Sequence, residues 1–255
     1  GVDNVSTSVG VGGQHGVRNS PTVYNAALHS MQFWDGRAAD VEAQAGGPVM
    51  NPVEMAIPTE AFLVKKLKGT PNYPGLFKTA FPASKDPLTF ENIREAIGAF
   101  ERTLLTPSRF DTYLKGDVNA LTATETDGLR TFLEVGCTNC HNGAAVGGTM
   151  LQKFGVHEDF RPYTGSSVSD QGRKDVTGKE ADRDLFMVPG LRNVTKTAPY
   201  FHDGHVAQLD SAIKIMAKVQ LDKELTDKEV SDLKVFLAAL TGTLPKNAAA
   251  TGSGP

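Results

Sequence analysis

The segment Cys137-Thr138-Asn139-Cys140-His141 contains both cysteines of this 255-residue chain, and a histidine directly follows the second. C-x-x-C-H is the attachment motif of c-type haem. Each thiol can form a thioether with one haem vinyl group, and the adjacent histidine can then bind the iron as its proximal ligand. The motif therefore predicts one covalent haem c, held by Cys137, Cys140 and His141.

Three other interpretations of the motif fit the sequence less well. A redox-active cysteine pair is expected beside a βαβ pattern, which this sequence lacks. A zinc site needs four ligands, and only two thiolates are available. A structural disulfide would leave His141 without a role. Because haem is attached covalently in the bacterial periplasm or an equivalent compartment, the motif also predicts an exported protein.

The sixth ligand of the iron is left open by the motif. Methionine and histidine are the usual choices, and a methionine thioether raises the reduction potential. For each candidate the alternative is ordinary packing in the core. The candidates that follow the motif are Met150, His157, Met187, His202, His205 and Met216.

Helical patterns surround the motif, whereas strand patterns are scarce. Amphipathic spacing predicts helices over 59–68, 89–105, 122–135, 209–219 and 226–240. The third and the fifth begin with the capping-box patterns TATE and TDKE. The long stretches 10–58 and 142–203 are unusual for a simple bundle and fit a chain that wraps a large prosthetic group. We therefore predict an all-α protein of cytochrome c-like domains with long haem-wrapping loops.

Composition agrees with a globular protein and excludes several classes. The chain is 40% hydrophobic and 22% charged, which excludes a mostly disordered chain. A net charge of −3 argues against a nucleic-acid-coating surface. The longest apolar run, 235–240, is too short to cross a bilayer. We expect a domain boundary near residue 118, a self-sufficient haem domain over 119–242 and a flexible tail over 243–255.

Several further segments, in this order and spacing, resemble the bacterial di-haem cytochrome c peroxidases. They cover most of the chain, from residue 6 to about residue 240. They are RNSPT (18–22), QFWDGRA (32–38), GPV (47–49), EM (54–55), CTNCH (137–141), VPGLRN (188–193) and APYFHDG (198–204). The resemblance implies two cytochrome c-like domains with one haem each, and the reduction of hydrogen peroxide to water. The related MauG group has a tyrosine in place of the methionine ligand.

The resemblance implies that the haem at Cys137 and Cys140 is the high-potential, electron-accepting one, with Met216 as its sixth ligand. The peroxide-reactive haem belongs to the N-terminal domain, of which 1–118 is the remainder. Its own C-x-x-C-H lies upstream in the family and is absent from this chain. We expect that this segment is either lost or a separate polypeptide.

Three further roles are implied by the resemblance. Trp34 matches a tryptophan between the two haems, where an indole shortens the path for an electron. Glu54 matches a distal-pocket glutamate, with Gln44 as a nearby pocket glutamine; a carboxylate there can move a proton between the two peroxide oxygens. A calcium site at the domain interface would use hard oxygen donors. Its predicted ligands are Asn19, Thr197 and Pro199.

One position departs from the family pattern. In many members a histidine before the RNSPT segment caps the peroxide-reactive haem in the resting enzyme. Its gap-free match here is Val11; His15, four residues nearer to that segment, could substitute as the capping ligand, although its spacing differs. If Val11 stands at that site, no capping ligand exists. We therefore hypothesise a five-coordinate peroxide-reactive haem that needs no prior reduction of its partner haem.

The expected protein is a periplasmic peroxidase subunit or fragment that forms homodimers. Its expected electron donor is a small cytochrome c or a cupredoxin. Two alternatives remain at this point. One is a non-enzymatic mono-haem electron-transfer cytochrome, which is what a single C-x-x-C-H encodes. The other is a MauG-like oxidase.

Overall fold

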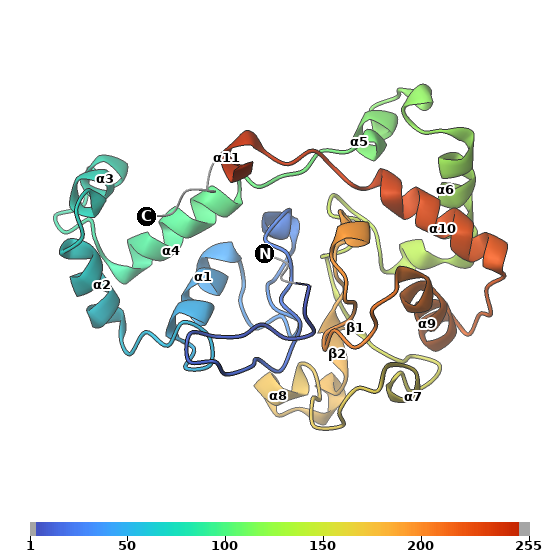
Figure 1. The fold of residues 1–255 in the computed structure, drawn as a ribbon, viewed down its shortest axis with the longest axis horizontal. Helices are drawn as coiled ribbons and strands as arrows, with labels where there is room; N and C mark the ends of the chain where they lie inside the picture. The colour runs from blue at the N-terminus through green and yellow to red at the C-terminus, as the bar shows by residue number, and fades with distance from the viewer. Residues whose placement is uncertain (1–3, 250–255) are drawn as a thin grey trace.

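The computed structural model describes residues 4–249, and its regular structure is almost entirely helical (Figure 1). The prediction of an all-α fold is confirmed. Two short strands, β1 (Leu151–Lys153) and β2 (Leu185–Met187), pair antiparallel with Leu151 opposite Met187. The α-helices are α1 (Val41–Met50), α2 (Glu60–Lys68), α3 (Tyr73–Ala80), α4 (Phe90–Glu101), α5 (Arg109–Leu114), α6 (Ala123–Val135), α7 (Arg161–Thr164), α8 (Lys174–Thr177), α9 (Leu209–Leu221), α10 (Asp227–Ala239) and α11 (Lys246–Ala249).

The helix starts follow the predicted caps. The hydroxyls of Thr122 and Thr226 accept hydrogen bonds from the backbone in full capping boxes at α6 and α10. The predicted end of one helix is wrong, because α4 stops at Glu101 and not at residue 105. After Glu101 the backbone N–H groups at 103 and 104 bond to carbonyls three residues earlier instead of four, as in a 3-10 turn. The Leu104 carbonyl then accepts a hydrogen bond from the N–H of Asn25.

Six helices were missed by the sequence analysis: α1, α3 and the shorter α5, α7, α8 and α11. The segment that forms α1 contains Gly46, Gly47 and Pro48, which are poor helix formers. It is helical because Asp40 caps its start and its buried face packs on α4. The short helix α3 buries only Phe77, which joins the apolar cluster between α2 and α4.

The main core lies where α5, α6 and α10 meet. Phe236 of α10 contacts Phe110 of α5 and Phe132 of α6, with ring centroids 5.3 and 5.2 Å apart. A Cβ atom at Gly128 would lie 2.1 Å from the carbonyl oxygen of Asp232, so only glycine lets α6 approach α10 this closely. This packing fixes the end of α6, from which the cysteine motif continues.

Two stretches of the chain, 21–38 and 189–206, repeat the same local fold with a constant offset of 168 residues. Each contains a left-handed asparagine with φ 61°, Asn25 or Asn193, followed by a 3-10 helix, η1 (Ala26–Leu28) or η5 (Val194–Lys196). Each then has a phenylalanine and a glycine at positive φ, and each closes with one antiparallel bridge. The bridges are Gln32 with Ala38 and Tyr200 with Val206. Trp34 and His202 occupy the same position of this repeat.

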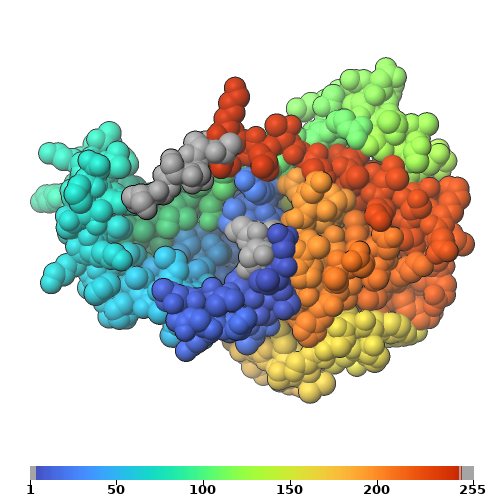
Figure 2. Space-filling model, viewed as in Figure 1, coloured from blue at the N-terminus to red at the C-terminus, as the bar shows by residue number. Residues whose placement is uncertain are grey.

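The first copy of the repeat lies against the second half of the chain. Figure 2 shows the N-terminal segment, in dark blue, beside the orange segment that follows β2. Arg18 donates to both oxygens of Asp170 at 2.6 and 2.7 Å and to Asp35 at 2.6 Å, and so ties the loop before α8 to this segment. Within residues 4–249 no helix is long and apolar enough to cross a membrane. The predicted boundary at residue 118 stays a prediction, as does the flexibility of the tail, of which 250–255 lie outside the described residues.

Candidate haem site

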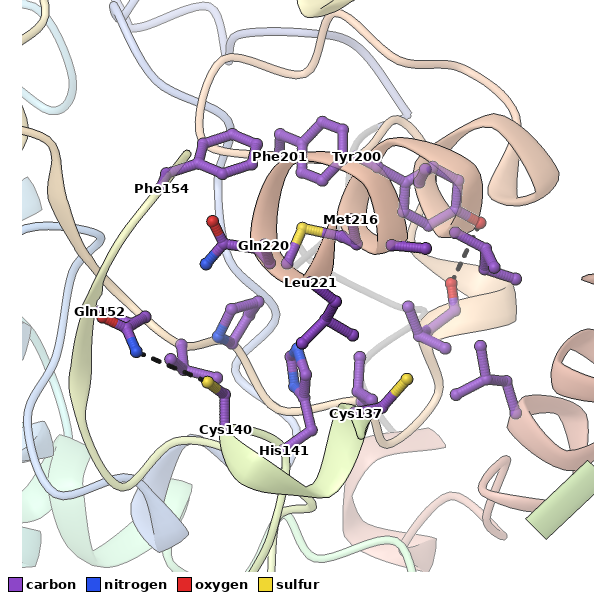
Figure 3. A pocket seen from close by; sticks show the side chains of 18 of the residues that line it. Cys137, Cys140, His141, Gln152, Phe154, Tyr200, Phe201, Met216, Gln220 and Leu221 are labelled. Atoms are coloured by element: carbon purple, nitrogen blue, oxygen red, sulfur yellow. Dashed lines mark hydrogen bonds between the residues drawn. The ribbon is translucent and has the colours of Figure 1, made fainter. Parts of the chain in front are cut away.

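The cysteine motif forms a tight turn at the end of α6. Gly136 ends the helix in the left-handed region, at φ 98°, and a 3-10 helix, η3 (Cys137–Asn139), follows. The N–H of His141 donates to the Cys137 carbonyl at 2.9 Å. Both thiols are free, and Figure 3 shows them on either side of His141, which rises into a cavity. The turn therefore presents both thiols and the imidazole to the same space.

The cavity is large and almost entirely apolar. Its empty volume is about 1250 Å³, including the part open to solvent. Its walls come from α6, β2, the second repeat, α9 and α10. The lining includes Phe132, Val135, Phe154, Phe186, Val188, Leu191, Tyr200, Phe201, Leu209, Ile213, Leu221, Leu233 and Leu237. Such a space suits a planar hydrophobic group.

Burial favours the neutral forms of two residues of the motif. It raises the pKa of Cys137 to about 11, so that its sulfur is a neutral thiol at pH 7 before any group is attached. Burial also lowers the pKa of His141 to about 4, although the carbonyls of Pro189 and Val146 favour its protonated form. A neutral imidazole is the form that binds iron.

The second nitrogen of His141 supports the same assignment. Its Nδ1 atom is buried and makes no hydrogen bond of normal geometry to any residue from 4 to 249. The backbone of Gly147 and the carbonyl of Pro189 lie close to this nitrogen. A Cβ added at Gly147 would be 3.2 Å from the nitrogen and 2.3 Å from the Pro189 oxygen. An iron-bound histidine usually donates its other N–H to a carbonyl or carboxylate. The residues present therefore fit a haem with His141 as its proximal ligand.

The structure narrows the choice of the sixth ligand. Met187, His202 and Met216 line the cavity, whereas Met150, His157 and His205 lie outside the residues that line it. Figure 3 shows the Met216 thioether, on α9, above His141 across the cavity. The assignment of Met216 as the sixth ligand stays a prediction that this placement favours.

Trp34 reaches this cavity from the other half of the chain. Its indole lines the cavity, and its Nε1 donates to the Asn19 carbonyl at 2.8 Å. Its ring meets that of His202 edge to face, with centroids 6.4 Å apart. The predicted bridging tryptophan thus lies against the predicted haem space, although its role stays a prediction.

The predicted peroxide-pocket residues lie in the first half of the chain. Gln44 is on α1, and Glu54 lies in the turn that follows that helix, where its carboxylate accepts a hydrogen bond from Asn51 at 2.7 Å. The N–H of Val11 donates to the Glu54 carbonyl at 2.8 Å, while the Val11 side chain is 76% exposed. The His15 side chain is exposed, and the backbone of His15 forms an isolated antiparallel β-bridge with Val9.

Two of the three predicted calcium ligands are in contact. The Nδ2 of Asn19 donates to the carbonyls of Pro199 at 2.7 Å and Phe201 at 3.3 Å. Thr197 follows η5 in the same loop. In this arrangement the amide nitrogen of Asn19 faces the carbonyls, so binding of a cation here would require the amide to turn its oxygen inward.

Other residues of the site were missed by the sequence analysis. Gln152 of β1 donates to the sulfur of Cys140 at 3.7 Å. Arg192 donates to both oxygens of Asp111 at 2.5 and 2.8 Å and to the Ala144 carbonyl at 2.6 Å, and so braces the loop after the motif. No local pattern marks these contacts, because their partners are distant in sequence.

Comparison with known proteins agrees with this geometry. Residues 1–119 match the family described as di-haem cytochrome c peroxidase. The chain is 47% identical to the cytochrome c551 peroxidase of Nitrosomonas europaea, over 96% of this chain and 72% of that protein. It is 46% identical to the cytochrome c551 peroxidase of Pseudomonas aeruginosa, over 96% and 71%. The fold matches the crystal structure of a MauG-like protein associated with microbial copper homeostasis, with a TM-score of 0.80, 26% identity and coverage of 98% of this chain and 82% of the other.

Proposed function

The chain belongs to the di-haem cytochrome c peroxidase family, and on that premise we propose that it is a subunit or fragment of a peroxidase that reduces hydrogen peroxide to water, with electrons entering at the haem of Cys137 and Cys140. The observation that carries the proposal is the cavity itself. Cys137, Cys140 and His141 form its floor, Met216 lies above them, and Trp34 enters from the other half of the chain.

When bound, the haem supplies one-electron redox chemistry, and the chain supplies its binding and its surroundings. Cys137 and Cys140 anchor the group by thioethers, while the apolar walls exclude water from it. Trp34 lies against the cavity on the side of the first half, and so offers a path for electrons toward that half.

The reduction of one hydrogen peroxide to two waters consumes two electrons and two protons. The half-buried Glu54 is the group proposed to move a proton from one peroxide oxygen to the other, with Gln44 orienting the substrate. Its hydrogen bond from Asn51 would hold the carboxylate in one position. The N–H of the exposed Val11 donates to the Glu54 carbonyl, and if Val11 rather than His15 stands at the capping position, no histidine caps this haem, as the five-coordinate hypothesis requires.

Donor, location and assembly are further parts of the proposal. The relatives are called cytochrome c551 peroxidases, which supports a small cytochrome c as donor, with a cupredoxin as the other candidate. The donor would dock near the open edge of the cavity. Covalent haem attachment supports a periplasmic location. Calcium at Asn19, Thr197 and Pro199, and a homodimer, complete the proposed enzyme.

The first experiment counts covalent haem in the intact protein. A denaturing gel stained for haem, read beside total haem in the native sample, should show one haem on this chain and a second one in the complete protein. One haem in total would favour an electron-transfer cytochrome and overturn the peroxidase proposal. A MauG-like oxidase is less favoured, because Met216 and not tyrosine lies above His141.

The second experiment tests the peroxide pocket. In the complete protein, Glu54→Gln should lower kcat for peroxide reduction with a reduced cytochrome c by about 10²-fold or more, since general acid–base groups contribute roughly 10²–10⁴-fold. The control is Glu60→Gln, an exposed carboxylate at the start of α2. Equal rates for both variants would remove Glu54 from the mechanism.

A further inference from the structure

A histidine of the first half of the chain packs onto the backbone behind the proximal ligand. His29 directly follows η1, in the first copy of the repeat. A Cβ at Gly148 would lie 2.3 Å from its Cδ2, and a Cβ at Gly190 would lie 2.8 Å from its Nε2. The imidazole therefore fills the space in front of both glycines.

These two glycines adjoin the residues that surround the Nδ1 atom of His141. Gly148 follows Gly147, and Gly190 follows Pro189. A Cβ at Gly147 would lie 2.3 Å from the Pro189 oxygen and 3.2 Å from this nitrogen, so the backbone at 147 and the Pro189 carbonyl pack closely around the His141 ring. We call residues 147–148 and 189–190 the proximal strap.

The strap is held in place from both sides. The N–H of Ser30 donates to the Gly148 carbonyl at 2.7 Å, and the Gly148 N–H donates to the Val188 carbonyl at 2.8 Å. His29 is thus next to the one backbone bond that ties this part of the first half to the strap. Burial lowers the pKa of His29, which favours the neutral form of the ring.

We propose that His29 is a positioning residue for the haem in the second half of the chain: its ring wedges against Gly148 and Gly190 and holds the Pro189 carbonyl beside Nδ1 of His141. A hydrogen bond from a ligating histidine to a carbonyl fixes the ring and makes the imidazole a stronger donor to iron. A stronger donor stabilises ferric iron over ferrous iron. The first half of the chain would in this way set the reduction potential of a haem that it does not itself bind.

The test is the reduction potential of His29→Ala in the complete, haem-loaded protein. Without the ring the strap can relax away from His141, so the potential should rise. We expect the redox equilibrium to shift at least threefold toward the ferrous form, which is about 28 mV at 59 mV per decade. The His141 Nδ1–H proton resonance of the ferrous protein should move upfield, because the Pro189 carbonyl would no longer be held close enough to accept a hydrogen bond from it. His29→Asn, a smaller deletion, should shift both in the same direction but less.

Asn25→Ala is the matched control. It removes a buried hydrogen bond from the same segment to Thr106, a residue outside the strap. It should lower stability and leave the potential unchanged. The inference is overturned if His29→Ala and His29→Asn keep the wild-type potential and resonance, or if Asn25→Ala shifts the potential equally.

A second test approaches the contact from the strap. Gly190→Ala should destabilise the protein, because its Cβ would meet the His29 ring. In the His29→Ala background the same substitution should cost less, and additive costs would contradict the contact. The inference rests on the proposed haem attachment. A chain without covalent haem would overturn that attachment, whereas an unshifted potential in the loaded protein would overturn only the role of His29.

Discussion

Replacing one buried hydroxyl should loosen the two halves of the chain. Thr106 is 1% exposed, and its Oγ1 accepts hydrogen bonds from the side-chain amides of Asn25 at 2.8 Å and Asn193 at 2.9 Å. These asparagines are equivalent positions of the internal repeat, each with φ 61°. A single oxygen thus joins the two copies between α4 and α5.

Thr106→Val keeps the shape of the side chain and removes this acceptor. It leaves two amide donors buried without a partner, each costing roughly 1–3 kcal/mol. Since the added methyl recovers part of this loss, we expect the free energy of unfolding to fall by about 2–4 kcal/mol. At a urea slope of roughly 2–3 kcal/mol/M, the midpoint should fall by about 1 M.

Urea unfolding followed by tryptophan fluorescence measures this change, because Trp34 is the only tryptophan of the chain and lies at the haem cavity. The control is Thr79→Val, whose exposed hydroxyl on α3 bonds only to the Gly75 carbonyl of its own helix. A loss below about 0.5 kcal/mol for Thr106→Val, no larger than that of the control, would refute the reasoning.

Three further predictions concern acid stability, the sixth ligand and activation. Burial opposes ionisation of Asp111, but hydrogen bonds from Arg192 and Ser108 outweigh it and lower its pKa to about 2 from 3.8. This carboxylate therefore stabilises the fold above about pH 4, and the stabilisation is lost as the pH falls through about 2; Asp111→Asn should flatten the acid limb of urea midpoints measured against pH. Met216→Ala should lower the reduction potential of the haem and let added imidazole bind the iron. Met187→Ala, a substitution in the same cavity, should do neither. Titrations followed by the visible spectrum measure both effects, and the reverse pattern would make Met187 the ligand. Val11→His should make peroxide turnover depend on prior reduction, whereas the unsubstituted protein should show equal initial rates in its oxidised and pre-reduced forms; strict dependence of the unsubstituted protein on prior reduction would contradict the five-coordinate hypothesis.

The parts of the fold that sequence alone predicted are those set by short-range chemistry. Thr122 and Thr226 begin α6 and α10 because capping needs only the next three residues. The thiols and His141 share one cavity because a single turn carries them. The family itself was predictable from ordered motifs, and relatives at 46–47% identity confirm it.

The parts that sequence did not predict depend on distant partners. The Gly46-Gly47-Pro48 run argues locally against a helix, and packing against α4 overrides it. Among the six possible sixth ligands, only the fold separates those that line the cavity from those that do not. The wedge formed by His29 was unpredictable for the same reason, since its glycine neighbours are more than a hundred residues away.

The internal repeat, and the contact between its two copies, could not be predicted from the sequence. Its two copies share only five of eighteen residues, a proline, an asparagine, a phenylalanine, an aspartate and a glycine. The backbone nevertheless repeats, because the asparagine, the phenylalanine and the glycine carry its positive-φ turns. The position between the shared phenylalanine and aspartate is Trp34 in one copy and His202 in the other, and these two rings meet edge to face while both line the cavity. Each half therefore contributes the same position of the same motif to this contact.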